Sequence, residues 1–406
     1  MKALTSHTTY TMILLFILLT LSLPVESKDK IPCSDSNLEK ARQTLNSLYK
    51  YYSNTNPNLL RENYPPAADS KVTYLASEQP DIPNEYSYLW PYSGVFSAVT
   101  ALYITSGEQY YKDLLLKKAL PGLNEYLDKK RIPTAYSSYI ISAPVSDRFY
   151  DDNLWIGIDF IDLYIYTHDN RFLDKAKMVW KFIESGTDKV LGGGIYWCEQ
   201  KKESKNTCSN APAAVLALKL YRATQDSSFL FKGKELYDWT KKHLQDPEDY
   251  LYYDNINLHG NVDKKKYSYN SGQMMQAAAL LYIITKDTKY LNECKNIAAA
   301  SYSYFFSATS GNSEKYRILN DGNIWFAGIM LRGYIELYHI NKEDTYIKAY
   351  CSNLSSAWNQ MRDQNGLFNT DWNKKKEDST KWLLTQAAFV EMYARLAELS
   401  KLINSK

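Results

Sequence analysis

The stretch Ala101-Leu-Tyr-Ile-Thr-Ser-Gly107 ends an apolar segment with a Leu-Tyr pair and a short polar turn, and a similar pattern recurs along the chain. Six copies are anchored by the tyrosines Tyr103, Tyr166, Tyr221, Tyr282, Tyr338 and Tyr393. Successive anchors are 63, 55, 61, 56 and 55 residues apart. Regular self-similarity of this kind indicates one supersecondary unit that is repeated along the chain.

Each copy contains two segments with helical spacing. The first is apolar on nearly every face, as in residues 211–220, which is typical of a helix packed on both sides. The second carries charge on one face, as in residues 173–182, which is typical of an outer helix. The last copy lacks a second segment, and the amphipathic residues 36–52 can take its place. We therefore predict an all-α fold, an (α/α)6 barrel of six helical hairpins, with an open helical solenoid as the alternative.

The N-terminal 27 residues have the composition of a signal peptide. Lys2 precedes an apolar run at residues 12–23, and the small residues Val25 and Ser27 follow it. The run is shorter than the about 20 apolar residues that a membrane span needs. We predict that residues 1–27 are removed, that residues 28–406 form a single catalytic domain without a membrane span, and that the protein is exported to the periplasm, the cell surface or the medium.

Composition limits the possible partners and the covalent framework. The 48 basic and 45 acidic residues are interspersed and give a net charge of only +3, so nucleic-acid binding, which needs a concentrated basic face, is not expected. The five cysteines are too sparse for a disulfide scaffold. Cys198 and Cys208 share one polar segment and are either bonded or separate thiols, whereas Cys294 and Cys351 are expected to pack as small apolar groups. We expect a monomer.

The segments that lead into the apolar helices are rich in aromatic, amide and acidic residues. In the predicted barrel they meet at one end, where we expect the functional site. Aromatic rings that stack on sugar faces and polar groups that bond to hydroxyls suit a carbohydrate ligand. The predicted substrate-binding residues are Trp90, Tyr92, Tyr150, Asn153, Trp155, Asn210, Asn270, Gln273, Asp321, Trp325, Trp382 and Gln386.

Two consecutive acids, Asp151 and Asp152, precede one of these helices. Glycoside cleavage needs one ionised and one protonated carboxyl group. Consecutive Cα atoms lie about 3.8 Å apart, so the carboxyl groups can reach the separation of about 5 to 5.5 Å that a retaining enzyme uses. An ionised neighbour and nearby aromatic rings raise the pKa of one acid. A helix N-cap is the alternative interpretation of this pair, and Asp321 is a competing catalytic candidate.

Other reaction classes find little support in the sequence. The five histidines show no paired spacing typical of zinc ligands. The glycines at 192–194 lack the sequence context of a phosphate-binding loop. We therefore expect neither a metal nor a cofactor.

Several motifs resemble glycoside hydrolase family 76, the endo-α-1,6-mannanases and their relatives. They are Tyr150-Asp-Asp-Asn-Leu-Trp-Ile-Gly157, Gly193-Gly-Ile-Tyr-Trp197, Ser209-Asn-Ala-Pro-Ala-Ala214 and Tyr269-Asn-Ser-Gly-Gln273. The resemblance implies an (α/α)6 barrel with a retaining mechanism on α-1,6-linked mannan, with Asp151 as nucleophile and Asp152 as general acid/base. Fungal members have Tyr-Asn-Gln-Gly in the last motif, so the role of Gln273 here is open. Transfer of the glycan to an acceptor and binding without catalysis are the alternatives.

Overall fold

The structure, a computed structural model, describes residues 36–66, 70–308, 317–320, 322–374 and 376–404. All of these belong to one compact unit, Pro32–Lys406. The predicted signal peptide, residues 1–27, and the candidate residue Asp321 lie outside the described residues.

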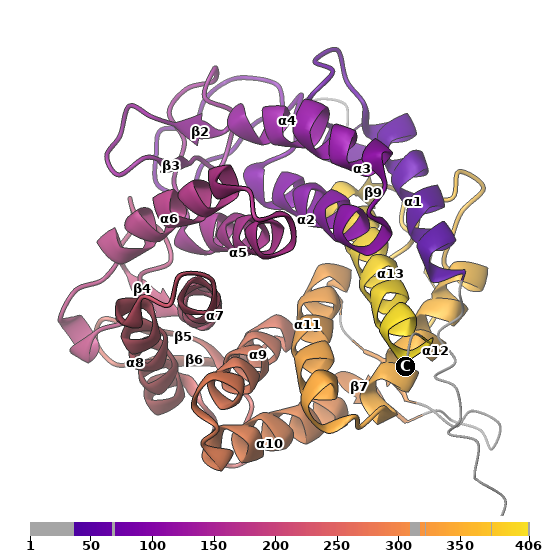
Figure 1. Cartoon of the computed structure of the whole chain (residues 1–406). Helices are drawn as coiled ribbons and strands as arrows, with labels where there is room; N and C mark the ends of the chain where they lie inside the picture. The colour runs from indigo at the N-terminus through magenta and orange to yellow at the C-terminus, as the bar shows by residue number, and fades with distance from the viewer. Residues whose placement is uncertain (1–35, 67–69, 309–316, 321, 375, 405–406) are drawn as a thin grey trace, which may run out of the picture. The chain divides into compact units, whose positions relative to one another are not determined.

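Six helices of the described chain form an inner ring (Figure 1). They are α2 (Leu89–Ser106), α5 (Tyr150–Thr167), α7 (Thr207–Thr224), α9 (Ser268–Thr285), α11 (Ile324–Asn341) and α13 (Leu383–Asn404). Each packs on the next, and α13 packs back on α2. This last contact closes the ring and excludes the open solenoid.

An outer layer of helices surrounds the ring, each beside the inner helix that precedes it in the chain. These are α3 (Gln109–Leu114), which continues through the π-helical turn Leu115–Ala119 into α4 (Leu120–Asn124), and α6 (Asn170–Ser185), α8 (Ser227–Leu244), α10 (Thr288–Phe305) and α12 (Thr345–Gln360). The sixth outer position is filled from the other end of the chain, because α1 (Asn37–Tyr52) packs on α13. The predicted (α/α)6 barrel, including the closing role of residues 36–52, is confirmed.

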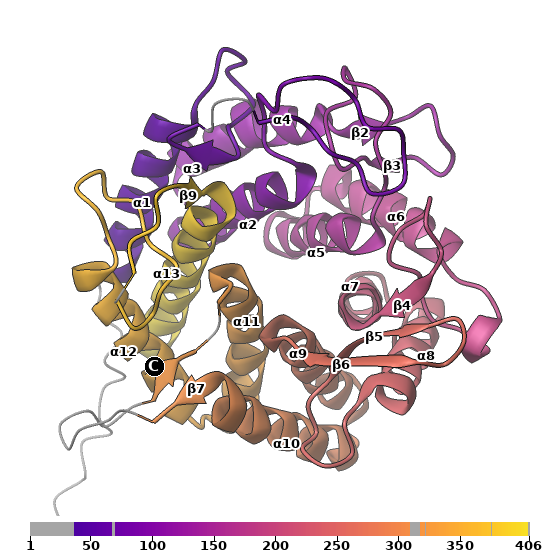
Figure 2. The ribbon, with the colours of Figure 1, turned by 180° about the vertical axis from the view of Figure 1, so that it is seen from behind.

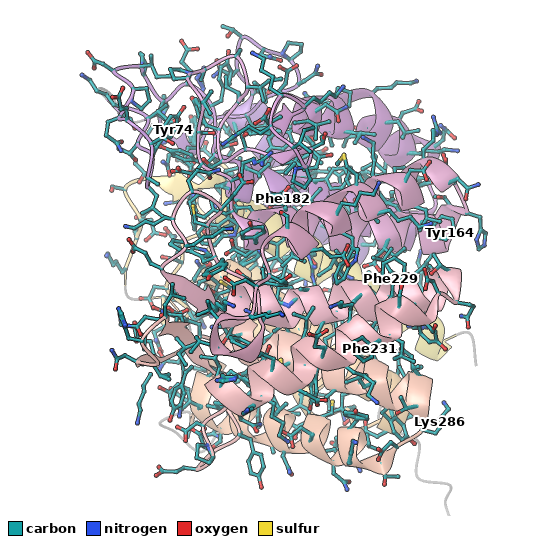
Figure 3. The ribbon with its side chains drawn as sticks, turned by 90° about the vertical axis from the view of Figure 1, so that its left-hand side faces the viewer. Tyr74, Tyr164, Phe182, Phe229, Phe231 and Lys286 are labelled. Atoms are coloured by element: carbon teal, nitrogen blue, oxygen red, sulfur yellow. The ribbon has the colours of Figure 1, made fainter. Side chains whose placement is uncertain are left out.

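The turns between inner and outer helices explain the repeat and correct one of its anchors. Five inner helices end at a residue with left-handed backbone conformation, whose N–H donates to the carbonyl oxygen of a tyrosine four residues earlier. In the second copy the left-handed residue is His168, so the anchor is Tyr164 and the assignment of Tyr166 was wrong. Tyr164 and Lys286, the left-handed residue of the fourth copy, lie at the opposite end of the helices from Tyr74 (Figure 3).

Short antiparallel strands lie at the end of the barrel opposite to these turns. They pair as β1 (Asn63–Tyr64) with β9 (Lys381–Trp382), β2 (Leu127–Asp128) with β3 (Ala135–Tyr136), β4 (Ser204–Asn206) with β5 (Tyr253–Asn257), β5 with β6 (Val262–Lys266), and β7 (Phe306–Ser307) with β8 (Ile318–Leu319). A 3-10 turn occupies Val190–Gly192. Strands β4, β6 and β9 lead almost directly into inner helices, so they mark the end at which those helices begin (Figure 2).

Inside the ring, buried acidic side chains bond to arginine and serine side chains of the same or a neighbouring helix. Glu391 accepts hydrogen bonds from Nε of Arg332 at 2.7 Å and from Nε of Arg395 at 2.6 Å. These two guanidinium groups outweigh burial and lower the pKa of Glu391 to about 2. Asp159 accepts a bond from the Ser97 hydroxyl, as the interior position of this acid on the helix suggests. These contacts belong to the core.

The cysteines differ from the sequence-based expectations. Cys198 and Cys208 are buried free thiols, so the disulfide considered between them is absent. The reason is their different settings: Cys198 pairs with Phe149 in a β-bridge, whereas Cys208 lies in the first turn of α7. Cys294 is a buried free thiol, as expected. Cys351 is disulfide-bonded, so its assignment as a simple packing group was wrong.

No helix in the described part of the chain is long and apolar enough to cross a membrane.

Candidate active site

The loops and strands at the starting end of the inner helices enclose a cavity of about 520 Å³, which we call the loop-end cavity. Its acidic lining residues are Glu62, Asp151, Asp152 and Asp254. Its aromatic lining residues are Tyr88, Trp90, Phe149, Trp155, Trp197, Tyr267, Tyr269, Trp325, Phe326 and Trp382. Among the described residues, no group of three or more His, Cys, Asp or Glu side chains is arranged to hold a metal ion.

Four tryptophans predicted from the sequence form one continuous aromatic wall in this cavity. Trp382 meets Trp90 edge to face with ring centroids 5.2 Å apart, and Trp90 meets Trp325 in the same way at 5.5 Å. Trp325 then meets Trp155 at 5.0 Å. The Nε1 atoms of Trp90 and Trp325 are buried without a hydrogen-bond partner. The wall therefore lines the cavity with aromatic rings, and two of its buried indole donors have no partner among the described residues, a combination that suits a sugar.

Asp151 and Asp152 lie in the first turn of α5 and line the cavity. The N-cap position belongs to Phe149, which has extended backbone, and no side chain caps the helix there. The acids therefore follow the N-cap position and do not occupy it, while the Asp151 carboxyl accepts from backbone N–H groups of this first turn. The two carboxyl groups are available to the cavity.

The two carboxyl groups have unequal surroundings. Asp151 accepts a hydrogen bond at Oδ2 from the indole Nε1 of Trp197 at 3.1 Å. Burial raises the pKa of Asp151, while hydrogen bonds from the Cys208 thiol and Trp197 oppose the rise, and the result is about 6. For Asp152, burial and then the charge of Asp151 raise the pKa well above its ordinary value. Asp151 therefore ionises first and Asp152 keeps its proton.

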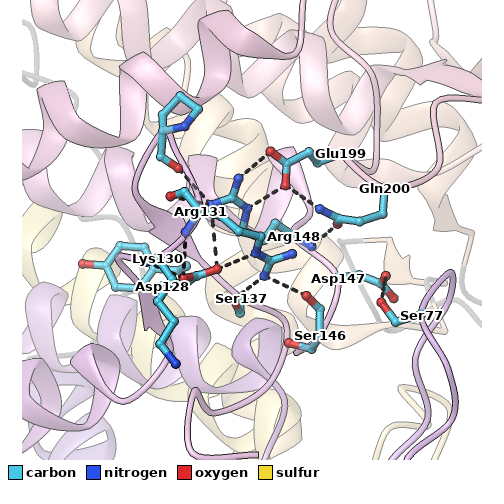
Figure 4. A network of polar contacts seen from close by, with 12 residues as sticks. Ser77, Asp128, Lys130, Arg131, Ser137, Ser146, Asp147, Arg148, Glu199 and Gln200 are labelled. Atoms are coloured by element: carbon cyan, nitrogen blue, oxygen red, sulfur yellow. Dashed lines mark hydrogen bonds and ion pairs between the residues drawn. The ribbon is translucent and has the colours of Figure 1, made fainter. Parts of the chain in front are cut away.

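A buried ion pair between Arg148 and Glu199 (Figure 4) links the segment before Asp151 to the segment after Trp197. Arg148 is 1% exposed, and its Nε donates to Oε2 of Glu199 at 2.6 Å. The backbones of the two segments also pair, since the N–H of Tyr150 donates to the carbonyl of Trp197 at 2.9 Å and that of Glu199 to Arg148 at 3.0 Å. The segment that carries the acids is thus fixed to the segment that carries the indole donor.

Two acids of the cavity, Glu62 and Asp254, were not predicted from the sequence. Glu62 accepts hydrogen bonds from Nε1 of Trp382 at 2.6 Å and from the N–H of Tyr88 at 2.8 Å, and burial raises its pKa to about 7. Asp254 lies on β5, and burial raises its pKa as well. The signal that could have identified Asp254 is its setting in Tyr-Tyr-Asp-Asn at 252–255, which resembles the other aromatic and acidic loop segments.

Three predicted sugar-binding amides are instead structural. Asn153 accepts from the N–H of Tyr136 at 2.8 Å and donates to the carbonyl of the same residue at 2.9 Å. Asn210 does the same with Ile195 at 2.7 and 3.0 Å, and Gln386 with Phe368 at 2.7 and 3.0 Å.

Each of these amides is 0% exposed and satisfies both backbone groups of one loop residue, as a strand partner would. Their assignment to substrate is therefore corrected: they hold the loops that shape the cavity.

Four other predicted residues also lie away from the cavity lining. Tyr92 is buried and donates its hydroxyl to the carbonyl of Asn58 at 2.7 Å. The Tyr150 ring stacks on a core phenylalanine with centroids 4.6 Å apart. Gln273 is fully buried within the inner ring, and Asn270 is fully buried close to the Asp254 carboxyl. None of the four is among the residues that line the cavity, so we correct their assignment to direct substrate contacts.

Comparison with known proteins decides the family. A sequence profile of glycosyl hydrolase family 76 matches residues 36–405. The chain belongs to glycosyl hydrolase family 76. A solved family 76 glycoside hydrolase, described as a mannosidase, from Bacteroides thetaiotaomicron VPI-5482 is 34% identical, with a TM-score of 0.81 and coverage of 90% of this chain and 99% of that chain. The resemblance seen in the sequence motifs is confirmed.

Two further relatives are less similar or match over a shorter part of the chain. An inactive variant of the α-1,6-mannanase of Salegentibacter sp. HEL1_6, with two consecutive aspartates replaced by asparagine, was solved with α-1,6-mannotriose. It is 24% identical, covers 90% of this chain and 99% of that chain, and shares the fold with a TM-score of 0.71. A mannan endo-1,6-α-mannosidase of Candida glabrata is 33% identical over 106 residues, 24% of each chain. The alignments with curated fungal relatives span 24% to 58% of their lengths.

Proposed function

We propose that this protein is a retaining glycoside hydrolase that cleaves α-1,6-mannosidic linkages in mannan, with Asp151 as the nucleophile and Asp152 as the general acid/base. One observation carries the proposal: two consecutive half-buried acids line one cavity, and side-chain donors bond to only the first of them. This inequality gives one ionised and one protonated acid, which is what the reaction requires.

The reaction would proceed in two displacements. In the first, the Asp151 carboxylate attacks the anomeric carbon, the glycosidic C–O bond breaks, and the leaving oxygen takes the proton of Asp152. In the second, the Asp152 carboxylate takes a proton from water, the water oxygen attacks the anomeric carbon, and Asp151 leaves. Two inversions give net retention of the anomeric configuration.

The Trp197 indole and Cys208 thiol favour the ionised form of Asp151 before attack. As the mannosyl ester forms, Asp151 loses its charge, so the pKa of Asp152 falls toward the value that a general base needs. The coupling between the two acids thereby lets Asp152 act as acid in the first step and as base in the second.

The mannan substrate is supported by the relatives and by the cavity. The solved relative at 34% identity is described as a mannosidase, and the Candida glabrata relative as a mannan endo-1,6-α-mannosidase. The wall of Trp90, Trp155, Trp325 and Trp382 offers faces for successive sugar rings.

We further propose that residues 1–27 direct export, and that residues 28–406 act as a single monomeric catalytic domain. The apolar run at residues 12–23 supports export.

The test is to incubate the protein, without residues 1–27, with debranched α-1,6-mannan. Proton NMR follows the anomeric configuration of the first products, and a reducing-end assay follows their amount. We expect α-configured manno-oligosaccharides from the wild type, and almost none from Asp151→Asn or Asp152→Asn. First products of β configuration would contradict retention. Products longer than the substrate in the presence of a short acceptor would favour transfer, and binding without any product would favour a silent glycan-binding protein.

A further inference from the structure

The loop-end cavity has a one-sided charge. Four of its lining residues are acids, whereas its described lining contains no lysine, arginine or histidine. The proposed reaction uses Asp151 and Asp152 and assigns no role to Glu62 or Asp254. Above pH about 7, the value to which burial raises the pKa of Glu62, these two acids add negative charge to a partly enclosed space.

Glu62 is held firmly at the aromatic wall. Each of its two oxygens receives one donor, the Trp382 indole on Oε1 and the Tyr88 N–H on Oε2. A carboxylate oxygen can accept two hydrogen bonds, so each oxygen keeps one position for a further donor. A sugar hydroxyl is such a donor.

Asp254 holds a comparable position on the β5–β6 hairpin. Its Oδ2 accepts a bond from Nδ2 of Asn255 at 2.9 Å, and both residues line the cavity. Lys265 acts on the Asp254 carboxyl only as a distant charge and forms its ion pair with Asp263. Asp254 therefore also retains acceptor capacity toward the cavity.

The residues that line the cavity also include two indole N–H donors without a partner among the described residues. Trp325 is 2% exposed and lines the cavity, yet its Nε1 has no partner, and the same holds for the Nε1 of Trp90. Indole donors can bond to hydroxyl oxygens, and carboxylates can accept from hydroxyl hydrogens. Hydroxyl groups satisfy both kinds of partner, whereas an anionic group satisfies only the donors.

We propose that Glu62 and Asp254 make the cavity selective for uncharged glycan chains: they accept bonds from sugar hydroxyls and repel chains that carry carboxylate or phosphate substituents. This inference rests on the proposed function. Repulsion between like charges within a poorly solvated cavity is strong enough to reduce kcat/KM for an anionic chain by about tenfold.

Matched substrates separate charge from size. We would compare α-1,6-mannan lightly substituted with carboxymethyl groups with the same mannan carrying neutral carbamoylmethyl groups. The wild type is expected to prefer the neutral derivative by about tenfold in kcat/KM at low salt, and less at high salt because ions screen the repulsion. Asp254→Asn, which keeps an oxygen acceptor, should reduce the preference by at least threefold.

Two control variants isolate the cause. Asp263→Asn removes the same charge from the same hairpin, outside the cavity lining. Because the charge of Asp263 raises the pKa of Asp254, its loss keeps Asp254 ionised, and the preference should remain. Trp382→Phe removes the indole donor that lowers the pKa of Glu62 but leaves the carboxyl group in place. At alkaline pH, where Glu62 stays ionised without this donor, it should keep the preference that Glu62→Gln reduces.

Equal kcat/KM for the two derivatives in the wild type would overturn the inference, and so would equal effects of Asp254→Asn and Asp263→Asn. Failure of the proposed function is distinguishable, because it would appear as no product from unsubstituted mannan. In that case, affinity electrophoresis of the Asp151→Asn, Asp152→Asn double variant in gels of each derivative still measures the charge preference. Equal retardation in the two gels would overturn it.

Discussion

Replacing Trp197 with phenylalanine tests how the structure separates the two catalytic pKa values. The change keeps an aromatic ring but removes the indole N–H that donates to Oδ2 of Asp151. That bond favours the ionised carboxylate, so its loss should raise the lower apparent pKa of the acid pair. The acidic limb of the kcat/KM profile should therefore move to higher pH.

The structure sets the size of this shift. A hydrogen bond to a charged group contributes about 1.5 to 3 kcal/mol, and charge-assisted bonds from nitrogen are typically about 2.7 to 2.9 Å long. The 3.1 Å distance from Trp197 to Asp151 places this bond at the weaker end. About 1.4 kcal/mol corresponds to one pKa unit. With a starting pKa of about 6 for Asp151, kcat/KM should fall about tenfold at acidic pH and little at alkaline pH.

The assay is a kcat/KM profile on an aryl manno-oligosaccharide over the pH range in which the protein stays folded. Trp325→Phe is the matched control, because this tryptophan lines the same cavity and its Nε1 has no hydrogen-bond partner. It can change the magnitude of kcat/KM but should not move the acidic limb. An unshifted limb in Trp197→Phe, or the same shift in both variants, would refute the reasoning.

Three further outcomes follow from the structure. Glu391→Gln should lower the free energy of unfolding, measured in urea at pH 7, by about 3 kcal/mol. This effect should shrink as the pH falls toward about 2, where wild-type Glu391 also takes up a proton. The control Glu203→Gln, at an exposed position, should change the free energy of unfolding little. Gln386→Ala should cost about 1 to 3 kcal/mol of stability with unchanged KM, whereas a raised KM at unchanged stability would restore the substrate assignment. Alkylation of the unfolded, unreduced protein, followed by peptide mass spectrometry, should leave Cys351 unlabelled and should label Cys198, Cys208 and Cys294.

The barrel could be predicted because its signals are local. Five of the six inner helices end in a turn whose tyrosine and left-handed residue are four positions apart, so short stretches of sequence are enough to identify the repeat. The one misassigned anchor, Tyr166 in place of Tyr164, arose where two tyrosines stand two residues apart. Both fit the pattern, and only the backbone conformation of His168 distinguishes them.

The site was predictable only in part, because some partners lie far apart in the chain and because the sequence does not show where a side chain points. Trp90, Trp155, Trp325 and Trp382 were identified because each stands at the start of an inner helix. Glu62 was missed because its partner Trp382 is 320 positions away in the chain.

The amides of Asn153, Asn210 and Gln386 were misassigned for a related reason. Each amide bonds to the backbone of a residue 15 to 18 positions earlier in the chain. Composition cannot reveal whether such a side chain points toward that backbone or into the cavity.

The measurement that tests the central claim most directly is chemical rescue with azide, using an activated aryl α-manno-oligosaccharide. In Asp151→Ala, azide should take the place of the missing nucleophile and give a β-mannosyl azide. In Asp152→Ala, the mannosyl-enzyme on Asp151 should still form, and azide should then give an α-mannosyl azide. Proton NMR distinguishes the two products. The opposite pairing of variant and anomer would reverse the roles of the two acids, and the absence of any azide product from both variants would contradict the assignment of this pair as the catalytic residues.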